Sequence, residues 1–238
     1  MDTLSGRVVA VYVGAVQGLE ARGRVHQTAF VKEPVAGPVR LSALGLEGDQ
    51  HVYHDHGGVD QALLVYSLDH YTFWRDEHNL DLPAAGAFAE NLTVEGLIET
   101  EVFIGDTFQI GDVATQVTSP RNPCYLIGVR YDNKKLPAVM QDAGNTGYLL
   151  RVISEGEIKG GDRVTLIDRP AETMTVREAG RVLSTDRDDW PTIERLIAIP
   201  ELADAMRLKL EARLAKRALD SEAIRLYGEG EGEGEPVA

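Results

Sequence analysis

A recurring Gly-Asp dipeptide divides the first part of the chain into short segments. It occurs at residues 48–49, 105–106, 111–112 and 161–162. Glycine accepts a positive φ and aspartate hydrogen-bonds within its own turn, so each pair marks a place where the chain reverses. Many short strands joined by such turns are typical of a β-barrel or a β-sandwich. The spacing therefore predicts a β-rich fold between residue 7 and about residue 168.

The segments between these turns have the residue composition of strands. Val8–Val13 is a short run of β-branched, apolar and aromatic residues, which suits a buried strand. Thr107–Ile110 and Ala114–Thr118 are joined through a Gly-Asp pair and predict a hairpin. The same pattern predicts further strands at Ala62–Tyr66, Val102–Ile104, Tyr148–Ser154 and Arg163–Ile167.

Two predicted helices interrupt this β region. Ser67 is a good helix-capping residue, and apolar residues at helical spacing follow it as far as His78. This stripe is interpreted as core packing rather than as a cofactor site. Leu136–Ala143 predicts a shorter helix that ends at Gly144, since glycine is common just beyond a helix C-terminus.

The pattern becomes helical after Pro170. Thr175-x-x-Glu178 is a capping-box pattern that predicts the start of a helix. Asp189 precedes a second helix start, and a longer amphipathic stretch follows Pro200. These signals predict a small, wholly helical appendage.

The change of pattern also predicts the domain boundaries. We expect a β-rich domain, either a barrel or a sandwich, at residues 1–170 and a helical C-terminal subdomain at residues 171–227. The Gly-Glu repeat at residues 228–238 has low complexity and predicts a disordered acidic tail.

The charge balance of the chain limits its partners. The formal net charge is −14, which opposes nonspecific binding to nucleic acid because neutralising phosphates requires an excess of Lys and Arg. A small anionic ligand in a locally cationic pocket is compatible with this charge. No apolar run is long enough to span a bilayer, and the N-terminus lacks signal-peptide features. We therefore expect a cytoplasmic protein that binds neither nucleic acid nor membranes.

The single cysteine, Cys124, lies in Pro120-Arg121-Asn122-Pro123-Cys124, directly after a predicted strand. A lone cysteine forms no intrachain disulfide, so its use is packing or reactivity. The two prolines restrict the backbone of this loop. The nearby guanidinium of Arg121 favours the thiolate, which is the form that acts as a nucleophile or metal ligand. A buried structural cysteine is the alternative, because free cysteine is among the most buried residue types.

Three histidines and three aspartates gather at residues 49–60. His54-x-His56 on a strand would face one side, which is compatible with a zinc or iron site. The neighbouring Gly57-Gly58 indicates a loop instead, and no H-E-x-x-H or C-x-x-C pattern accompanies the cluster. One functional histidine among solvated ones is the favoured interpretation.

Six short motifs occur in a fixed order along the chain. They are Gly45–Asp49, His56–Ala62, Phe88–Leu92, Ile104–Asp106, Pro120–Tyr125 and Gly147–Val152. Together they resemble a MOSC domain (molybdenum cofactor sulfurase C-terminal domain) of the YiiM type. Residues 175–227 are similar to the three-helix C-terminal extension of that group.

This resemblance implies a mainly β fold with added helices, namely a Greek-key β-barrel, and a site that binds molybdenum cofactor (molybdopterin). It implies that Cys124 ligates molybdenum, because soft thiolates suit such metals. Arg121 would contact the anionic phosphate or oxo groups of the cofactor. His56 and Asn91 match positions that line the pocket, with His56 as a proton donor in catalysis. Lys32 falls in a stretch where the family places basic pocket residues.

The resemblance also implies an activity, namely reduction of N-hydroxylated compounds such as the purine analogue 6-N-hydroxylaminopurine. The electrons would come from a separate electron-donor protein, because the chain has no Gly-x-Gly-x-x-Gly dinucleotide fingerprint. Pyridoxal phosphate is not an expected cofactor. A homodimer is compatible with the sequence, which leaves the oligomeric state open.

Two other functions are compatible with the same residues. One is a sulfur carrier or transferase that holds a persulfide on Cys124. The other is a non-catalytic carrier of molybdenum cofactor. All three need a reactive cysteine near cationic groups.

Two motifs depart from the family pattern. The segment 147–151 is Gly-Tyr-Leu-Leu-Arg where the family often has Gly-Trp-Tyr-Leu-Arg, and Ala89 stands where the family usually has glycine. If this position has a positive φ, the alanine is mildly strained.

Overall fold

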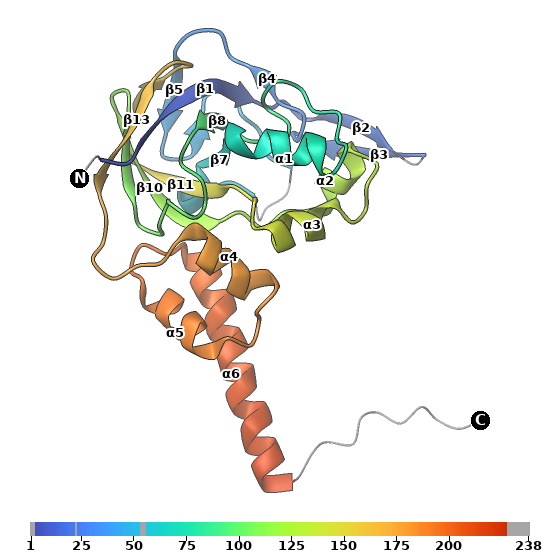
Figure 1. Cartoon of the computed structure of the whole chain (residues 1–238), viewed down its shortest axis with the longest axis vertical. Helices are drawn as coiled ribbons and strands as arrows, with labels where there is room; N and C mark the ends of the chain where they lie inside the picture. The colour runs from blue at the N-terminus through green and yellow to red at the C-terminus, as the bar shows by residue number, and fades with distance from the viewer. Residues whose placement is uncertain (1–2, 22, 53–55, 228–238) are drawn as a thin grey trace. The chain divides into compact units, whose positions relative to one another are not determined.

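The computed structural model describes residues 3–21, 23–52 and 56–227 (Figure 1). The chain forms two compact units, which we describe separately. The first ends at Ala203 and the second begins at Asp204. No helix in the described ranges is long and apolar enough to cross a membrane.

Within the described residues, seven strands close into a barrel. Their order is β13 (Arg163–Asp168), β9 (Thr107–Ile110), β10 (Val113–Pro120), β11 (Tyr148–Ser154), β7 (Leu63–Ser67), β8 (Leu92–Glu95) and β1 (Ser5–Val13). Pairing of β1 with β13 closes the barrel. Strands β7 and β8 run parallel and the other barrel pairs are antiparallel. The expected mainly β barrel with added helices is confirmed.

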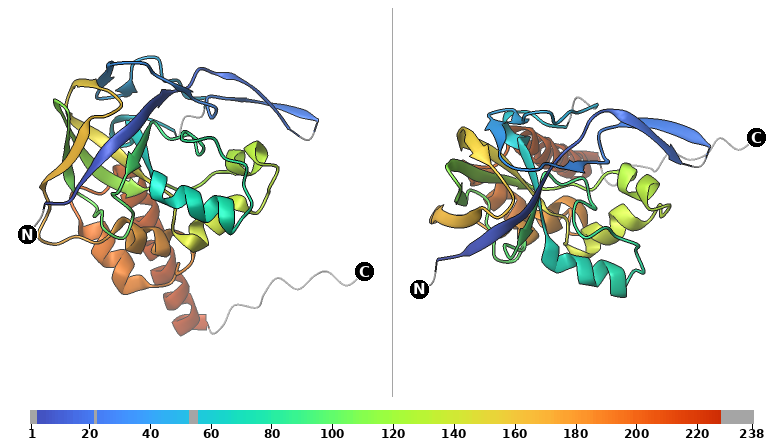
Figure 2. Two further views of the ribbon diagram at one scale, coloured as in Figure 1. Left: turned by 45° about the horizontal axis from the view of Figure 1, so that its top comes forward. Right: turned by 90° about the horizontal axis from the view of Figure 1, so that it is seen from above.

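Shorter strands lie outside this barrel order. Strands β2 (Gln17–Ala21) and β3 (Arg24–Thr28) form a ribbon of their own, which projects from the barrel in Figure 2. A small three-stranded sheet consists of β12 (Gly156–Ile158), β5 (Val39–Ser42) and β6 (Gly45–Leu46). Strand β4 (Glu33–Pro34) pairs with the end of β1.

The Gly-Asp pairs do form turns. Their glycines all have a positive φ, namely Gly48 at 87°, Gly105 at 87°, Gly111 at 54° and Gly161 at 92°. The hairpin predicted around Gly111 is confirmed, because β9 and β10 pair antiparallel across it.

The strand predicted at Val102–Ile104 is wrong. This segment forms turns, with a single bridge between Phe103 and Thr175. The physical reason is a buried carboxylate, since Asp106 accepts the Phe103 N–H at 2.9 Å and forms an ion pair with Arg169 at 2.6 Å. The backbone pairing is therefore limited to one bridge, in which the Ile104 N–H donates to the Met174 carbonyl at 3.0 Å and the Val176 N–H donates to the Val102 carbonyl at 2.8 Å.

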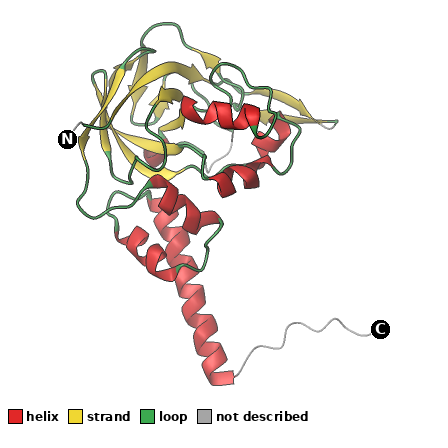
Figure 3. Cartoon of the chain, viewed as in Figure 1, coloured by secondary structure: helices red, strands yellow, loops and turns green. Residues whose placement is uncertain are grey.

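The helices begin and end close to their predicted signals (Figure 3). Ser67 caps a 3-10 turn (Leu68–His70) that continues into α1 (Tyr71–Asp76). Helix α3 (Leu136–Ala143) ends at Gly144, whose φ is 68°. The remaining helical elements are η1 (Val59–Gln61), α2 (Tyr125–Arg130), α4 (Val176–Ser184), α5 (Trp190–Ala198) and α6 (Asp204–Tyr227).

The three-helix C-terminal region is confirmed. Thr175 Oγ1 accepts the Glu178 N–H at 3.1 Å and so caps α4. Asp189 caps α5 by accepting the Thr192 N–H at 3.3 Å. The domain boundary expected at residue 170 stays a prediction.

An aromatic core beside the barrel supports the loop that carries the cysteine. It includes Tyr66 on β7, Trp74 on α1, Phe88, and Leu126 on α2, all at most 2 % exposed. Cys124 packs against this cluster. The core therefore gives the cysteine loop a rigid base.

Candidate functional site

Cys124 lies at the junction between the end of β10 and the start of α2. It is the N-cap residue of α2, with extended backbone angles of −102° and 167°. Its side chain is half-buried, and the preceding Pro123 is buried. The thiol is thus held on a stiff loop with one side in the core and part of its surface open.

Arg121 lies in the same loop and is buried, with 9 % of its surface exposed. Its Nη1 atom is buried and has no hydrogen-bond partner among the described residues. Burial lowers the pKa of the Arg121 guanidinium, and the nearby Cys124 and Glu90 oppose this shift. Because this side chain is buried, it forms no surface ion pair with the residues that the structure describes.

An unpartnered, buried guanidinium donor is rare in folded proteins and indicates a missing acceptor. Guanidinium groups form their strongest hydrogen bonds with carboxylate, phosphate and similar anions. The side chain of Arg121 therefore provides a donor for an anionic group close to Cys124.

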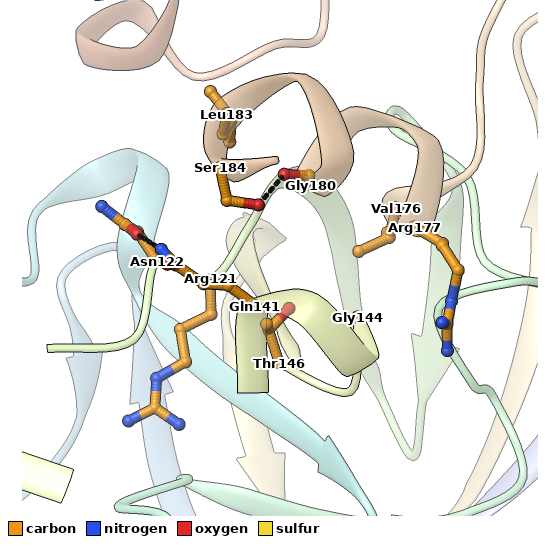
Figure 4. Close-up of a pocket in the computed structure, with 10 residues that line it drawn as sticks. All are labelled: Arg121, Asn122, Gln141, Gly144, Thr146, Val176, Arg177, Gly180, Leu183 and Ser184. Carbon is orange, nitrogen blue, oxygen red and sulfur yellow. Dashed lines mark hydrogen bonds between the residues drawn. The ribbon is translucent and has the colours of Figure 1, made fainter. Parts of the chain in front are cut away.

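A small pocket lies near this loop, between Asn122 on one side and Gly180 and Ser184 of α4 on the other (Figure 4). Its volume is about 20 Å³, which is room for about one water molecule. In Figure 4 the Arg121 guanidinium points away from Ser184 and Gly180. The unpartnered Nη1 donor of Arg121 is therefore not directed at the part of this pocket formed by α4.

A hydrogen bond to Gly147, the residue before β11, holds the loop of Arg121 in place. The Arg121 N–H donates to the Gly147 carbonyl at 3.0 Å. The Gly147 N–H donates to Glu99 Oε1 at 2.7 Å, and Glu99 Oε2 lies 2.5 Å from His70 Nε2. His70 and Glu99 are both buried. This chain of bonds fixes the backbone from which Arg121 extends.

Glu90 is the acidic counterpart of the site and is fully buried. Its Oε1 accepts from the Tyr71 hydroxyl at 2.6 Å, the Thr93 hydroxyl at 2.8 Å and the Gly86 N–H at 3.1 Å. Its Oε2 accepts the Phe88 N–H at 2.8 Å. These four donors hold a carboxylate in a fixed position inside the protein.

Lys32 forms a second buried ion pair, with Asp49. Its Nζ donates to Asp49 Oδ1, and the two side chains are 6 % and 3 % exposed. Burial lowers the pKa of Lys32, while Asp49 and, more weakly, Glu90 raise it. Glu90 therefore acts electrostatically on Lys32 as well as on Arg121.

Asn91 joins this pair to the barrel. Its Nδ2 donates to Asp49 Oδ2 at 2.8 Å and to the Tyr12 carbonyl at 3.3 Å. Its Oδ1 accepts the Leu64 N–H at 3.0 Å. A side-chain amide has two donors and two acceptor lone pairs, so Oδ1 can accept one more hydrogen bond. Asn91 thus bridges β1, β7 and the Asp49 turn.

His56 is exposed and directly follows residues 53–55, so its predicted role stays a prediction. His54 lies outside the described residues. Gly57 and Gly58 have φ values of 78° and 93°, which a loop requires and a regular strand does not allow. The described ranges contain no group of three His, Cys, Asp or Glu side chains that could hold a metal ion.

Two residues of the site were missed or underrated from the sequence. Asp49 is more than a turn residue, because its carboxylate binds both Lys32 and Asn91. Glu90, which precedes Asn91 in the Phe88–Leu92 motif, was not predicted as a site residue. The available signal was a carboxylate inside an apolar segment, Phe88–Leu92, since a buried carboxylate requires several donors.

Ala89 adopts the left-handed conformation, with φ at 64°. We expect Ala89→Gly to stabilise the protein by about 0.5–1 kcal/mol, because glycine adopts this φ without the steric penalty of a Cβ atom. Urea unfolding at constant m-value measures the change. The matched control is Ala87→Gly, since Ala87 is buried and has no positive φ. Destabilisation by both variants alike would contradict the strain at Ala89.

Fold and site together define a class of protein. It is a small closed β-barrel that presents a half-buried thiol beside a buried guanidinium with an unused donor. Such a site suits an anionic ligand or cofactor that is also bound by sulfur.

Comparison with known proteins identifies the family. A MOSC domain model matches residues 52–165, and a YiiM-like, 3-alpha helix domain model matches residues 174–217. The chain therefore belongs to the MOSC domain family and, within it, to the YiiM-like proteins.

Three relatives show the extent of the similarity. The uncharacterized protein YflK of Bacillus subtilis is 35% identical, over 84% of this chain and 90% of that protein. YiiM of Escherichia coli is 33% identical, over 92% of this chain and 98% of that protein. The crystal structure of YiiM from Escherichia coli is similar to this structure with a TM-score of 0.73 and 30% identity, over 90% of this chain and 94% of that chain. A reductase of Gibberella moniliformis is 34% identical over 75% of this chain, but over only 32% of its own length.

Proposed function

We propose that this protein binds molybdenum cofactor and reduces N-hydroxylated compounds such as N-hydroxylated purines, with Cys124 as the molybdenum ligand. The observation that carries the proposal is the buried Nη1 donor of Arg121, which has no partner in the described ranges and lies near Cys124. Membership of the MOSC family and the similarity to a fungal reductase support it.

The residues present fit such a cofactor. The half-buried thiol of Cys124 offers a soft ligand on a rigid loop. The Arg121 guanidinium offers a hydrogen-bond donor to the anionic part of the cofactor. When bound, the cofactor supplies two-electron redox chemistry. The chain itself holds the ligand atom, orients the anion and excludes water on the core side of the loop.

The other residues of the site have narrower roles in this proposal. Glu90 balances the charges of Arg121 and Lys32 from inside the protein. Lys32 uses one of its three ammonium donors on Asp49, which leaves two for the cofactor. Asn91 keeps Asp49 in place and has one acceptor position left. His56 is exposed and is assigned the delivery of protons from solvent.

The reaction consumes both electrons and protons. An N-hydroxylated amine takes up two electrons and two protons, its N–O bond breaks, and an amine and water are released. A separate electron-donor protein supplies the electrons. The similarity to the fungal reductase supports a separate electron donor. About two-thirds of that protein lies outside the part that matches this chain, so this chain lacks a counterpart of that part.

The test is to purify the full chain from a host that makes molybdenum cofactor. We expect one molybdenum and one pterin per chain, and reduction of 6-N-hydroxylaminopurine with an artificial electron donor. Cyanide-labile sulfur on Cys124 without molybdenum would overturn the proposal and indicate a sulfur carrier. Bound molybdenum without turnover of any N-hydroxylated compound would indicate a cofactor carrier instead.

A further inference from the structure

Tyr125 is an unusual aromatic residue in this protein. Among the Phe, Tyr and Trp residues whose side chains the structure describes, it alone is exposed, with 53% of its surface open. It is also the residue that directly follows Cys124 and begins α2. An aromatic surface therefore lies beside the proposed metal ligand.

The ring of His26 contacts the ring of Tyr125. His26, on β3 of the β2–β3 ribbon, lies with its ring centroid 5.9 Å from that of Tyr125, at an interplanar angle of 59°. The ribbon contacts α2 through β2, and Figure 2 shows it projecting over that side of the barrel. Leu19 pairs with His26 across the ribbon, so the two side chains share one face.

We propose that Tyr125 and His26 form a subsite that stacks against the planar heteroaromatic ring of the substrate. This inference rests on the proposed function and adds to it the two residues that recognise the ring of the substrate. Every base or similar ring has a π-face that stacks on an exposed aromatic side chain. Tyr125 directly follows Cys124 in the sequence, so a ring stacked on Tyr125 would bind next to the loop that carries the proposed metal ligand.

A purely structural role for the same contact makes a different prediction. If the Tyr125–His26 contact only docks the ribbon on α2, its loss changes stability but does not distinguish between ligands. If Tyr125 stacks on the substrate, its loss weakens the binding of ligands that contain an aromatic ring and leaves the binding of ring-free ligands unchanged. Selectivity between the two ligand types therefore separates the two roles.

The experiment compares Tyr125→Leu, Tyr125→Phe and Val25→Ala in the cofactor-loaded protein. Val25 is the control because it neighbours His26 on β3 and so faces the opposite side of the ribbon. The binding probe is adenine, which cannot be reduced, measured by equilibrium dialysis. The kinetic probes are 6-N-hydroxylaminopurine and the ring-free N-hydroxyguanidine.

For Tyr125→Leu we expect both the Kd of adenine and the KM of the purine to rise on the order of 10-fold. The KM of N-hydroxyguanidine, and all values for Tyr125→Phe and Val25→Ala, should stay near those of the unmodified protein. Absence of adenine binding, unchanged binding in Tyr125→Leu, or equal losses for both substrates would overturn the subsite. Adenine binding lost in Tyr125→Leu, in a protein that reduces neither substrate, would support the subsite while refuting the proposed reductase function.

Discussion

Replacing Cys124 with serine is expected to reduce the molybdenum content of the purified protein to background and to abolish reduction of N-hydroxylated substrates. Serine keeps the size and the loop conformation but removes the soft thiolate donor that such a metal prefers. The measurement is metal analysis of protein made in a cofactor-producing host, together with an assay using an artificial electron donor.

The control for this variant lies two residues upstream. Asn122 is exposed and accepts a hydrogen bond from Gln141 at 2.8 Å, so Asn122→Ala perturbs the same loop without touching the sulfur. It should retain molybdenum. Equal molybdenum in Cys124→Ser and the unmodified protein would refute the ligand assignment.

Replacing Glu90 with alanine is expected to have the largest effect on folding. The change leaves the Tyr71 and Thr93 hydroxyls and the Phe88 N–H without the carboxylate that accepts from them. The Gly86 N–H keeps only its bond to Thr93 Oγ1 at 3.3 Å. A buried polar group left without its partner costs about 1–3 kcal/mol. We therefore expect a loss of at least about 3 kcal/mol, a large part of the stability of a typical domain. Equilibrium unfolding in urea measures it.

Glu95→Ala is the matched control, since Glu95 is partly exposed and its ion pair with Arg7 lies on the surface. Surface pairs contribute about 0–1 kcal/mol, so this variant should stay close to the unmodified protein. Glu90→Gln keeps the shape and one acceptor oxygen, and should lie between the two. Similar unfolding midpoints for Glu90→Ala and Glu95→Ala would contradict the role assigned to Glu90.

Much of the barrel could be predicted because its signals are local. The bounds of β9 and β11 agree with the predicted segments, and α3 ends at Gly144 as expected. Turn glycines and helix caps act on neighbouring residues, so a single sequence contains them. Closure of the strands into a barrel is a long-range property and followed only from the family resemblance.

Other elements could not be predicted from such local signals. The strand β2 (Gln17–Ala21) has no apolar alternation, because most of the ribbon is exposed. Helix α2 spans only six residues, which is too short for a recognisable helical period. The prediction at Val102–Ile104 was wrong because the segment makes a single bridge and then turns, with Asp106 accepting the Phe103 N–H.

The candidate site also combines residues that are close in sequence with residues that only the fold brings together. Arg121 and Cys124 are three residues apart in sequence, so their proximity was predictable from the chain alone. Lys32, Asp49 and Asn91 meet only through the fold, across sequence separations of 17 and 42 residues. The charge of Lys32 was identified, but its partner was not.

The closing pair of the barrel has a consequence for biosynthesis. Ser5–Arg7 pair with Arg163–Thr165, so β1 leaves the ribosome well before its partner strand β13 has been made. Chains grow at about 5–20 residues per second, which leaves the free edge of β1 open for roughly ten seconds or more at moderate rates. Unpaired edges invite association with other chains. A chaperone that shields the nascent N-terminal strand would therefore raise the yield of this protein more than one that acts after release.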